Sequence, residues 1–389
     1  MSGGTRSYEM ARRLVSVGHE LNMVTTSRAI NNRHKGWRVT DESGIKVHWL
    51  GVPYSNQMSF AQRIKAFLHF AAAAAAKAAS LESDVIIATS TPLTIALPAV
   101  YAAKRRHVPM VFEVRDLWPT LPIAVGALKN PLLIRGAYWL EQFAYRNAAQ
   151  VIALSPGMRD GVIKTGYPAD QVHVIPNSAD LEFFNVPAEQ GIKFRQKYEW
   201  LQGRPLIIYT GAIGQANGLS YLVRLAAKVK ETDSEVRFLV LGDGKEEQLV
   251  HDLAQSLGVL NVNFFLSESI PKKNIPPVLS AASIAISTVI DIKEMWDNSA
   301  NKFFDALASG TPVAINHEGW QAELIREKDI GMILDGKDLH KARETLLKGI
   351  YDVKWLREAG IRAKQLAKDR FDRDKLASEF EEVLKKSLN

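Results

Sequence analysis

Two aspartates and a lysine lie within one short segment, residues 297–312, which reads DNSANKFFDALASGTP. Lys302 lies between Asp297 and Asp305, which seven residues separate. The apolar pattern predicts a helix that begins near Asn301 and ends at the following Gly-Thr-Pro. Carboxylates accept hydrogen bonds from sugar hydroxyls, and a lysine at a helix N-terminus can stabilise a phosphate. The segment could therefore hold a sugar, a ribose and a phosphate, or Asp297 and its two successors could simply cap the helix.

A glycine-rich turn follows the predicted strand 206–210 and precedes a predicted helix. It contains Gly211, Gly214 and Gly218, with Asn217 beside the last of them. Glycines at such a turn let backbone N–H groups approach a phosphate at a helix N-terminus. The spacing is neither that of a dinucleotide fingerprint nor that of a P-loop. A phosphate site is therefore one interpretation, and close packing of helix on strand is the other.

A second turn, Gly242-Asp243-Gly244-Lys245, ends the predicted strand 236–241. Its glycines would let a flat base or a ribose lie against the backbone. The turn could equally be the start of a helix, with acidic residues that favour the helix N-terminus. The motif alone does not decide between the two.

Charged residues also follow a predicted strand in the other half of the chain. Arg115 and Asp116 come directly after the strand 109–114, and residues at the carboxyl ends of parallel strands are candidates for substrate contact. Gly3 and Gly4 precede the first predicted helix, where they would let an acceptor or a phosphate come close. An α/β domain normally places a strand before such a turn, so we expect the first strand to be missing.

The composition is that of a globular protein of 389 residues, which predicts two domains of ordinary size. The chain has no cysteine, so disulfides and thiolate catalysis are excluded. Its nine histidines are scattered without ligand spacing, so no metal site is expected. The longest apolar stretch, 66–76, is too short to span a bilayer.

The net charge of +7 is unevenly distributed. Residues 1–182 contain 20 Lys and Arg against 13 Asp and Glu, whereas the remainder has 29 of each. A basic half favours an anionic partner such as a lipid surface, unless the excess is chance scatter. Nucleic acid is not favoured, because no aromatic base platforms lie among the basic residues. The predicted helix 59–81 could pack on the sheet or dip into a membrane interface, since it combines apolar and basic residues: Phe60, Ile64, Phe67, Leu68, Arg63 and Lys65.

Predicted strands and helices alternate along the whole chain, which indicates α/β domains with parallel, doubly wound sheets. The pattern predicts two Rossmann-like domains with a cleft between them. We expect an N-terminal domain over 1–180 and a C-terminal domain over 181–370. The final helix, 371–389, is expected to pack back toward the N-terminal domain.

Seven stretches resemble the retaining, metal-independent GT-B glycosyltransferases of glycosyltransferase family 4, and the resemblance covers essentially the whole chain. They are GGTRSYEMARRLVSVGHEL, FEVRDLWP, YRNAAQVIALSPGM, VHVIPNSAD, YTGAIGQANGL, LVLGDGKE and NSANKFFDALASGTPV. The stretches RDLWP and NKFFDALASG are most similar to those of the bacterial branch that builds O-antigen and capsule repeat units.

The resemblance implies that the C-terminal domain binds a nucleotide-sugar and the N-terminal domain an acceptor. The family's Glu-x7-Glu motif corresponds to Asp297, for the sugar, and Asp305, for the ribose. Many members grip the diphosphate with an arginine and a lysine where this chain has Ala212 and Asn217, so Lys302 should stabilise more of that charge. The expected catalytic residues are Lys302, Arg115, Asp116 and Asp297. The expected donor contacts are Gly211, Gly214, Asn217, Gly242, Gly244, Lys245, Asn301 and Asp305, and the expected acceptor contacts are Gly3 and Gly4.

The function implied is transfer of a sugar, an N-acetylhexosamine in this branch, from a UDP-sugar with retention of anomeric configuration. The acceptor would be a saccharide or a sugar on a polyprenyl diphosphate, at the cytoplasmic membrane face, with no cofactor and no metal. Two alternatives remain open. One is a UDP-sugar 2-epimerase, and the other is a non-catalytic nucleotide-sugar-binding protein.

Overall fold

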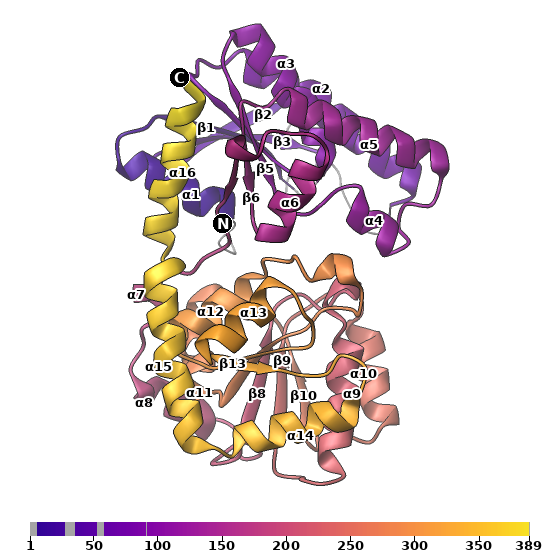
Figure 1. Cartoon of the computed structure of the whole chain (residues 1–389), viewed down its shortest axis with the longest axis vertical. Helices are drawn as coiled ribbons and strands as arrows, with labels where there is room; N and C mark the ends of the chain where they lie inside the picture. The colour runs from indigo at the N-terminus through magenta and orange to yellow at the C-terminus, as the bar shows by residue number, and fades with distance from the viewer. Residues whose placement is uncertain (1–5, 28–35, 53–57, 91, 389) are drawn as a thin grey trace. The chain divides into compact units, whose positions relative to one another are not determined.

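A computed structural model describes residues 6–27, 36–52, 58–90 and 92–388. The chain divides into two compact α/β units, which are treated separately below (Figure 1). Among the described residues, the N-terminal unit comprises those between 6 and 175 together with 377–388, and the C-terminal unit comprises 176–376. The expected acceptor glycines, Gly3 and Gly4, lie outside the described residues, and so do the side chains at 60, 63 and 64.

The described strands of the N-terminal unit form two sheets rather than the single doubly wound sheet that we expected. A three-stranded sheet has the order β1-β3-β2, and a four-stranded parallel sheet has the order β4-β5-β6-β7. In the first sheet β1 is parallel to β3, whereas β2 runs antiparallel to β3. The strands are β1 (Leu21–Ser27), β2 (Trp37–Glu42), β3 (Ile45–Gly51), β4 (Ile86–Thr89), β5 (Met110–Val114), β6 (Gln150–Ala153) and β7 (Val172–Val174).

Most helices of this unit connect successive parallel strands, as that topology requires, and the first helix precedes the first described strand. Local signals fix where two of them begin: Asn130 caps α5 ahead of Pro131, and Ser155 caps α6 ahead of Pro156. The helices are α1 (Arg6–Ser16), α2 (Phe60–Ala79), α3 (Ala96–Arg106), α4 (Thr120–Ala124), α5 (Pro131–Arg146) and α6 (Pro156–Lys164), with short 3₁₀ turns η1 (Leu93–Ile95) and η2 (Ala169–Gln171).

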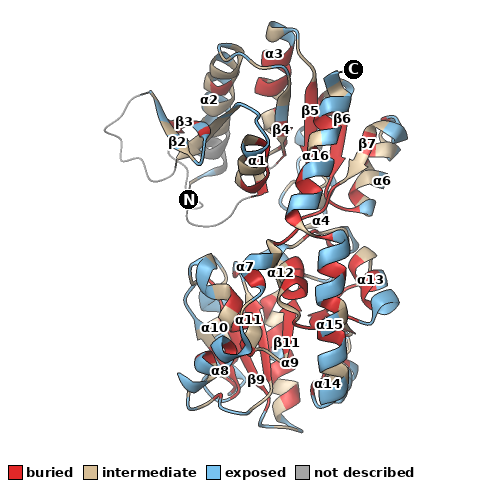
Figure 2. Cartoon of the chain, turned by 90° about the vertical axis from the view of Figure 1, so that its left-hand side faces the viewer, coloured by how far each residue is buried: buried red, intermediate tan, exposed pale blue. Residues whose placement is uncertain are grey.

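A single six-stranded parallel sheet organises the C-terminal unit, in the order β10-β9-β8-β11-β12-β13. Its central strands are continuous apolar runs because both faces are covered, and β9 and β11 are buried along their length (Figure 2). The strands are β8 (Leu206–Thr210), β9 (Arg237–Leu241), β10 (Phe264–Ser267), β11 (Ile284–Ser287), β12 (Val313–Ile315) and β13 (Gly331–Ile333).

Two buried clusters, one on each face of this sheet, form the core of the C-terminal unit. Helices on both faces cover it, as in other doubly wound sheets. They are α7 (Leu181–Phe184), α8 (Ala188–Gln196), α9 (Leu219–Lys230), α10 (Glu247–Ser256), α11 (Ile275–Ala281), α12 (Asn301–Ser309), α13 (Trp320–Lys328), α14 (Leu339–Ile350) and α15 (Val353–Arg370), with 3₁₀ turns η3 (Gln215–Asn217), η4 (Lys272–Asn274) and η5 (Lys293–Met295).

The last helix, α16 (Arg373–Leu388), begins in the C-terminal unit and continues into the N-terminal one. In the N-terminal unit, His19 Nε2 lies 2.9 Å from a carboxylate oxygen of Glu381 on this helix. None of the helices in the described part of the chain is both long enough and apolar enough to cross a membrane.

Candidate functional site

Lys302 lies at the centre of a polar network in the C-terminal unit. Its Nζ donates to the Tyr209 hydroxyl at 2.9 Å and to Asn217 Oδ1 at 3.0 Å. The same atom lies 4.3 Å from the centroid of the Tyr209 ring, which is within the range of a cation–π contact. Three separate elements supply these residues: the last part of β8, the turn η3 and the first turn of α12.

The carbonyl of Ala212 orients both partners of this lysine. It accepts a hydrogen bond from the Tyr209 hydroxyl at 2.8 Å and another from Asn217 Nδ2 at 3.0 Å. Because each partner gives its proton to Ala212, each presents an oxygen lone pair to Lys302. The backbone of the glycine turn therefore fixes the position of the ammonium group.

Both oxygens that contact Lys302 are neutral, so its charge is not cancelled by them. Burial lowers the pKa of Lys302 to about 7, from an ordinary value of 10.5. Burial also raises the pKa of Tyr209, which stays protonated at neutral pH. An anion that approached this ammonium would stabilise the charged form and raise its pKa.

The N-terminus of α12 lies next to this lysine and has no side-chain cap. Its N-cap residue is Ala300, and Asn298 Oδ1 accepts from the Ala300 amide at 3.3 Å, just before the helix. Ser299 bonds instead to Asn177, through its hydroxyl at 3.0 Å and its carbonyl at 2.6 Å. The alternative in which Asp297 to Ser299 cap the helix is therefore wrong. The first amides of α12 remain suited to an anion.

Asp305 lies one turn further along α12, on the same face as Lys302. The opposite face buries Phe303, Phe304 and Leu307 in the core, which fixes the helix rotation. Asp305 Oδ1 is buried and has no hydrogen-bond partner among the described residues. Burial raises the pKa of Asp305 to about 6, although Lys272 and Arg373 act in the opposite direction. An unsatisfied buried oxygen of this kind is suited to accept from a ligand hydroxyl.

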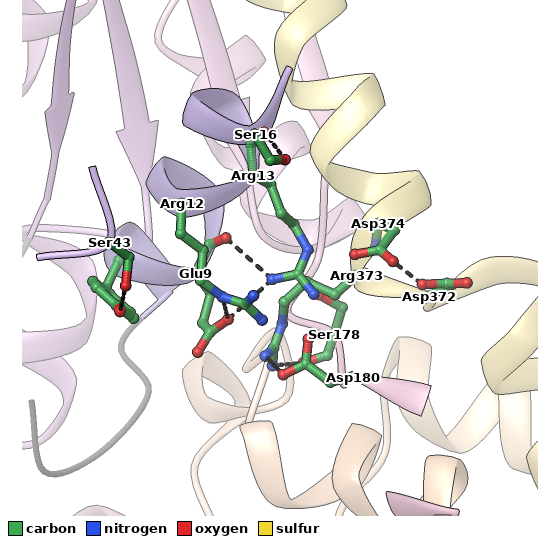
Figure 3. A network of polar contacts seen from close by, with 11 residues as sticks. Glu9, Arg12, Arg13, Ser16, Ser43, Ser178, Asp180, Asp372, Arg373 and Asp374 are labelled. Carbon is green, nitrogen blue, oxygen red and sulfur yellow. Dashed lines mark hydrogen bonds and ion pairs between the residues drawn. The ribbon is translucent and has the colours of Figure 1, made fainter. Parts of the chain in front are cut away.

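Arg373 anchors the segment that leads into the C-terminal unit. Its guanidinium donates to Asp180 and to the Ser178 carbonyl (Figure 3). Asp372 and Asp374 flank it with an Asp-x-Asp spacing, so the interpretation that the chain has no carboxylate pair of this kind is wrong. The Asp374 amide donates to Asp372 Oδ1 at 3.0 Å. That bond gives Asp372 a local role at the beginning of α16.

The glycines of the turns 211–218 and 242–245 allow these two turns to pack closely against each other. A Cβ on Gly242 would lie 1.9 Å from the Gly211 carbonyl oxygen, and one on Gly244 would lie 2.2 Å from that of Ile213. A Cβ on Gly211 would meet Lys302 Cε at 3.3 Å, and the positive φ of 137° there also favours glycine. Close packing is thus sufficient to explain these three glycines. A Cβ on Gly214 would meet no atom closer than 4.0 Å.

Several backbone amides of the 211–218 turn already have partners. The amides of Gly211 and Ile213 donate to the carbonyls of Leu241 and Asp243, and those of Asn217 and Gly218 donate within the turn. The turn therefore offers a ligand fewer N–H donors than its glycines suggest. A larger share of any phosphate contact must come from Lys302 and the start of α12.

The remaining expected residues of the donor site lie on the segments that precede α12 or follow β9 and at the first position of α12. Asp297 is half-buried in the turn between η5 and α12, and Asn301 is exposed at the first position of α12. Lys245 is exposed after the second glycine turn, where it is free to reach a ligand. The network also contains Tyr209, which was expected only as part of a strand. Its signal was a tyrosine two residues before Gly211.

Arg115 and Asp116 belong to the N-terminal unit, where both are half-buried just after β5. The Arg115 amide donates to the Ser90 hydroxyl at 2.9 Å. The preceding Glu113 is buried, pairs with Arg6 at 2.7 Å and accepts from the Thr89 hydroxyl at 2.8 Å. Arg6 and Glu113 thus fix the carboxyl end of β5, a role that the sequence analysis did not foresee. Beside them on α1, Glu9 pairs with Arg12 and Arg13 (Figure 3).

Two family models match the chain, one for each half. Residues 3–178 match the glycosyl transferase 4-like domain, and residues 191–365 match the glycosyl transferases group 1. Among curated proteins, the chain is 23% identical over 281 residues to the putative colanic acid biosynthesis glycosyl transferase WcaI of Escherichia coli, covering 68% of each. It is 26% identical over 301 residues to the alpha-maltose-1-phosphate synthase of Mycolicibacterium smegmatis, covering 72% of this chain and 73% of that protein.

Solved structures share the fold. The sucrose-phosphate synthase of Thermosynechococcus elongatus superposes with a TM-score of 0.80 at 15% identity, covering 98% of this chain and 93% of that one. Anabaena HepE in complex with UDP and glucose superposes with a TM-score of 0.70 at 18% identity, covering 88% and 87%. Taken with the two family matches, this likeness shows that the chain belongs to the group 1 glycosyltransferases of GT-B fold.

Proposed function

We propose that the chain transfers a sugar, an N-acetylhexosamine, from a UDP-sugar to a saccharide or polyprenyl-diphosphate-linked acceptor, with retention of anomeric configuration. The reaction would serve bacterial surface polysaccharide synthesis, in the cytoplasm at the inner face of the cell membrane. The matched relative named for colanic acid synthesis supports that setting. HepE, whose structure holds UDP and glucose, supports the class of donor.

The observation that carries the proposal is the position of Lys302. A lysine whose contacts are two neutral oxygens lies in the first turn of a helix without a side-chain cap. A diphosphate is the ligand whose charge such an arrangement stabilises best. Asp305, one turn away with an unpaired oxygen, would accept from the ribose hydroxyls. Asp297, before the helix, would contact the sugar.

In the proposed reaction the bond from the anomeric carbon to the UDP oxygen breaks as the acceptor oxygen bonds to that carbon. The acceptor hydroxyl attacks from the face that UDP leaves, and its proton passes to the departing phosphate. Lys302 and the amides of α12 stabilise the charge that develops on UDP, which is where electrostatic catalysis acts. This assigns the leaving-group charge to the lysine and the helix rather than to a metal ion. Arg115 and Asp116 would contact the substrate.

Two measurements test this function. The first is a thermal-shift screen of the full chain with UDP-, GDP- and dTDP-sugars, since a ligand that binds only the folded state raises the unfolding temperature. We expect stabilisation by UDP-sugars alone. The second measures UDP release and product formation from a UDP-N-acetylhexosamine, with and without a polyprenyl-diphosphate-linked saccharide as acceptor.

Acceptor-dependent release of UDP, with an α-linked product from an α-linked donor, is the expected result. Conversion of the UDP-sugar without any acceptor would indicate a 2-epimerase instead. UDP binding with neither hydrolysis nor transfer over a panel of donors and acceptors would indicate a non-catalytic nucleotide-sugar-binding protein. A preference for GDP- or dTDP-sugars would contradict the choice of donor.

A further inference from the structure

Three helices of the N-terminal unit form a layer whose charged residues are almost all basic. α3 packs against both α2 and α5, and the three run next to one another (Figure 1). The side chains that the structure describes on these helices include seven basic residues and one acidic residue. The basic residues are Lys65 and Lys77 on α2, Lys104, Arg105 and Arg106 on α3, and Arg135 and Arg146 on α5. A charge of one sign over neighbouring helices attracts an anionic partner.

The single acidic residue of this layer does not offset that charge. Glu141 on α5 is 5% exposed, and the hydroxyl of Tyr145 donates to it at 3.4 Å. Burial raises the pKa of Glu141 to about 7, so the carboxyl is partly neutral at physiological pH. The exposed side of α5 therefore presents basic residues without a compensating acid.

The same side of α5 exposes large apolar side chains. Leu132 is 80% exposed and Trp139 is 61% exposed, and their spacing of seven residues places both on one face of the helix. Arg135 lies between them, three residues from Leu132 and four from Trp139, and is also exposed. Trp139 stacks on Phe143 with 5.3 Å between ring centroids, which holds the indole in place.

The neighbouring helices continue this composition. Tyr101 on α3 is 54% exposed and Leu68 on α2 is 57% exposed. Lys129, just before the Asn130 cap of α5, is exposed as well. Leucine and tryptophan among exposed lysines and arginines are typical of helices that lie in the interface of an anionic bilayer.

We propose that α5, with the adjoining basic helices α3 and α2, docks this protein on the surface of an anionic lipid bilayer. Leu132 and Trp139 enter the boundary between headgroups and acyl chains, while Arg135 and Lys129 contact lipid phosphates. Both the insertion of apolar side chains and the contacts of basic residues with lipid phosphates are needed, because a few of either kind alone give weak, reversible binding. A second copy of the chain is a poorer occupant, since two such faces would bring like charges together.

Co-sedimentation of the full chain with vesicles tests this docking. Vesicles of phosphatidylcholine alone are compared with vesicles that also contain phosphatidylglycerol. We expect binding to the anionic vesicles only, weakened by added salt because screening acts on exposed charges. Arg135→Glu changes the charge by two units and should weaken partitioning about 30-fold. Leu132→Ser with Trp139→Ser should weaken it at least about tenfold.

Matched controls come from the C-terminal unit. Leu249 and Ile361 are 51% and 62% exposed, and Lys368 is exposed on α15. Leu249→Ser with Ile361→Ser, and Lys368→Glu, should leave vesicle binding unchanged. The unfolding temperature of every variant, and its shift with UDP, show whether the variant is folded and keeps its donor site.

The proposal is overturned if the wild type binds neutral and anionic vesicles equally, or if the α5 variants bind vesicles as well as the controls do. It is also overturned if the α5 variants convert a dimer to a monomer while vesicle binding is unchanged, because the face would then be a subunit interface. The docking does not rest on the proposed donor. A chain that binds UDP but not vesicles would refute the docking alone, and the reverse result would refute the donor assignment alone.

Discussion

The ammonium of Lys302 is held by the hydroxyl of Tyr209, 2.9 Å away, and lies 4.3 Å from the centroid of the same ring. The ring and its hydroxyl both favour a cation, yet neither carries a full negative charge. The lysine is therefore positioned without being neutralised. This is the arrangement that a site for an incoming diphosphate requires, because no ion pair has to be broken when the ligand binds.

Donor affinity should depend on pH with a maximum between about 6 and 7. Lys302, with a pKa of about 7 in the empty site, must be protonated to stabilise the diphosphate, so affinity falls as the pH rises above that value. Asp305, with a pKa of about 6, accepts ribose hydroxyls best as a carboxylate, so affinity falls as the pH drops below that value. Calorimetric titration with a UDP-sugar at several pH values measures this profile.

A UDP-sugar is suited to measuring this pH profile, because its diphosphate is esterified at both ends and does not itself titrate near neutral pH. Proton uptake on binding above pH 7, seen as a dependence of the measured heat on the buffer, is the companion observation. An affinity that stayed constant from pH 6 to pH 9 would contradict the role of Lys302.

Asn217→Asp should place a carboxylate beside Lys302, so that the lysine forms an ion pair. A carboxylate would replace an amide oxygen that lies 3.0 Å from the ammonium, and the pKa of Lys302 would rise. The new charge would also repel the diphosphate, so we expect UDP affinity to fall by about 2 kcal/mol at pH 7. The alkaline limb of the pH profile should move to higher pH.

Gln215→Glu is the matched control, since Gln215 is exposed in the same turn. It adds the same charge without contacting Lys302, so a smaller loss and an unmoved alkaline limb are expected. Equal losses for the two variants would show that general repulsion, rather than the contact with Lys302, explains the effect.

Asp305→Asn should stabilise the fold and weaken the donor site. The folded-state pKa of Asp305, about 6, lies above its ordinary value of 3.8, so the wild type is progressively destabilised as the pH rises from about 4 to 6. The variant avoids this cost, and its free energy of unfolding should exceed that of the wild type by about 3 kcal/mol above pH 6. Urea unfolding at pH 4 and pH 7 measures the difference.

At pH 4 the two proteins should differ little in stability, because Asp305 is then protonated in the folded state and only partly ionised in the unfolded state. Affinity for UDP should fall in the variant at pH 7. A variant that was less stable at pH 7, with unchanged UDP affinity, would mean that the carboxylate has a structural partner rather than a ligand.

Arg6→Met should destabilise the N-terminal unit. The guanidinium bonds to Glu113 at 2.7 Å and to the Ile175 carbonyl at 2.8 Å, and both charged side chains are nearly inaccessible. Removing one partner leaves a buried charge unpaired, which costs about 3 kcal/mol. Chemical denaturation measures the loss. Adding Glu113→Gln should restore part of it, and a double variant no more stable than Arg6→Met would contradict the pairing.

Strands β8 to β12 of the C-terminal unit were predictable because parallel strands buried on both faces form continuous apolar runs, as β8 and β9 do, whereas the three-residue edge strand β13 was missed. The edge strand β2 was missed, because its half-exposed residues carry no such run. Its signal was the turn Ser43-Gly44 between β2 and β3, where both residues have positive φ.

The candidate residues of the site could be named from the sequence, whereas only some of the contacts between them could be predicted. The spacing of Asp297, Lys302 and Asp305 was visible in the sequence, and the structure places the last two on one face of α12. The contact between Lys302 and Tyr209 joins residues 93 positions apart, so only the fold brings them together. The cap at Ala300 could not be inferred either, because it depends on Ser299 bonding to Asn177 instead.

The most direct test of the whole account is the affinity for UDP of the wild type and of Lys302→Met, measured by calorimetric titration at pH 6.5, with Lys368→Met as the control. Loss of a charge-assisted contact to the diphosphate should weaken binding by about 2–3 kcal/mol, or roughly 30- to 150-fold. The variant should remain folded, because methionine fills a similar volume without the cost of a buried charge. We predict tight binding to the wild type and the control and a loss in Lys302→Met alone. Equal UDP affinity in all three proteins would contradict the account.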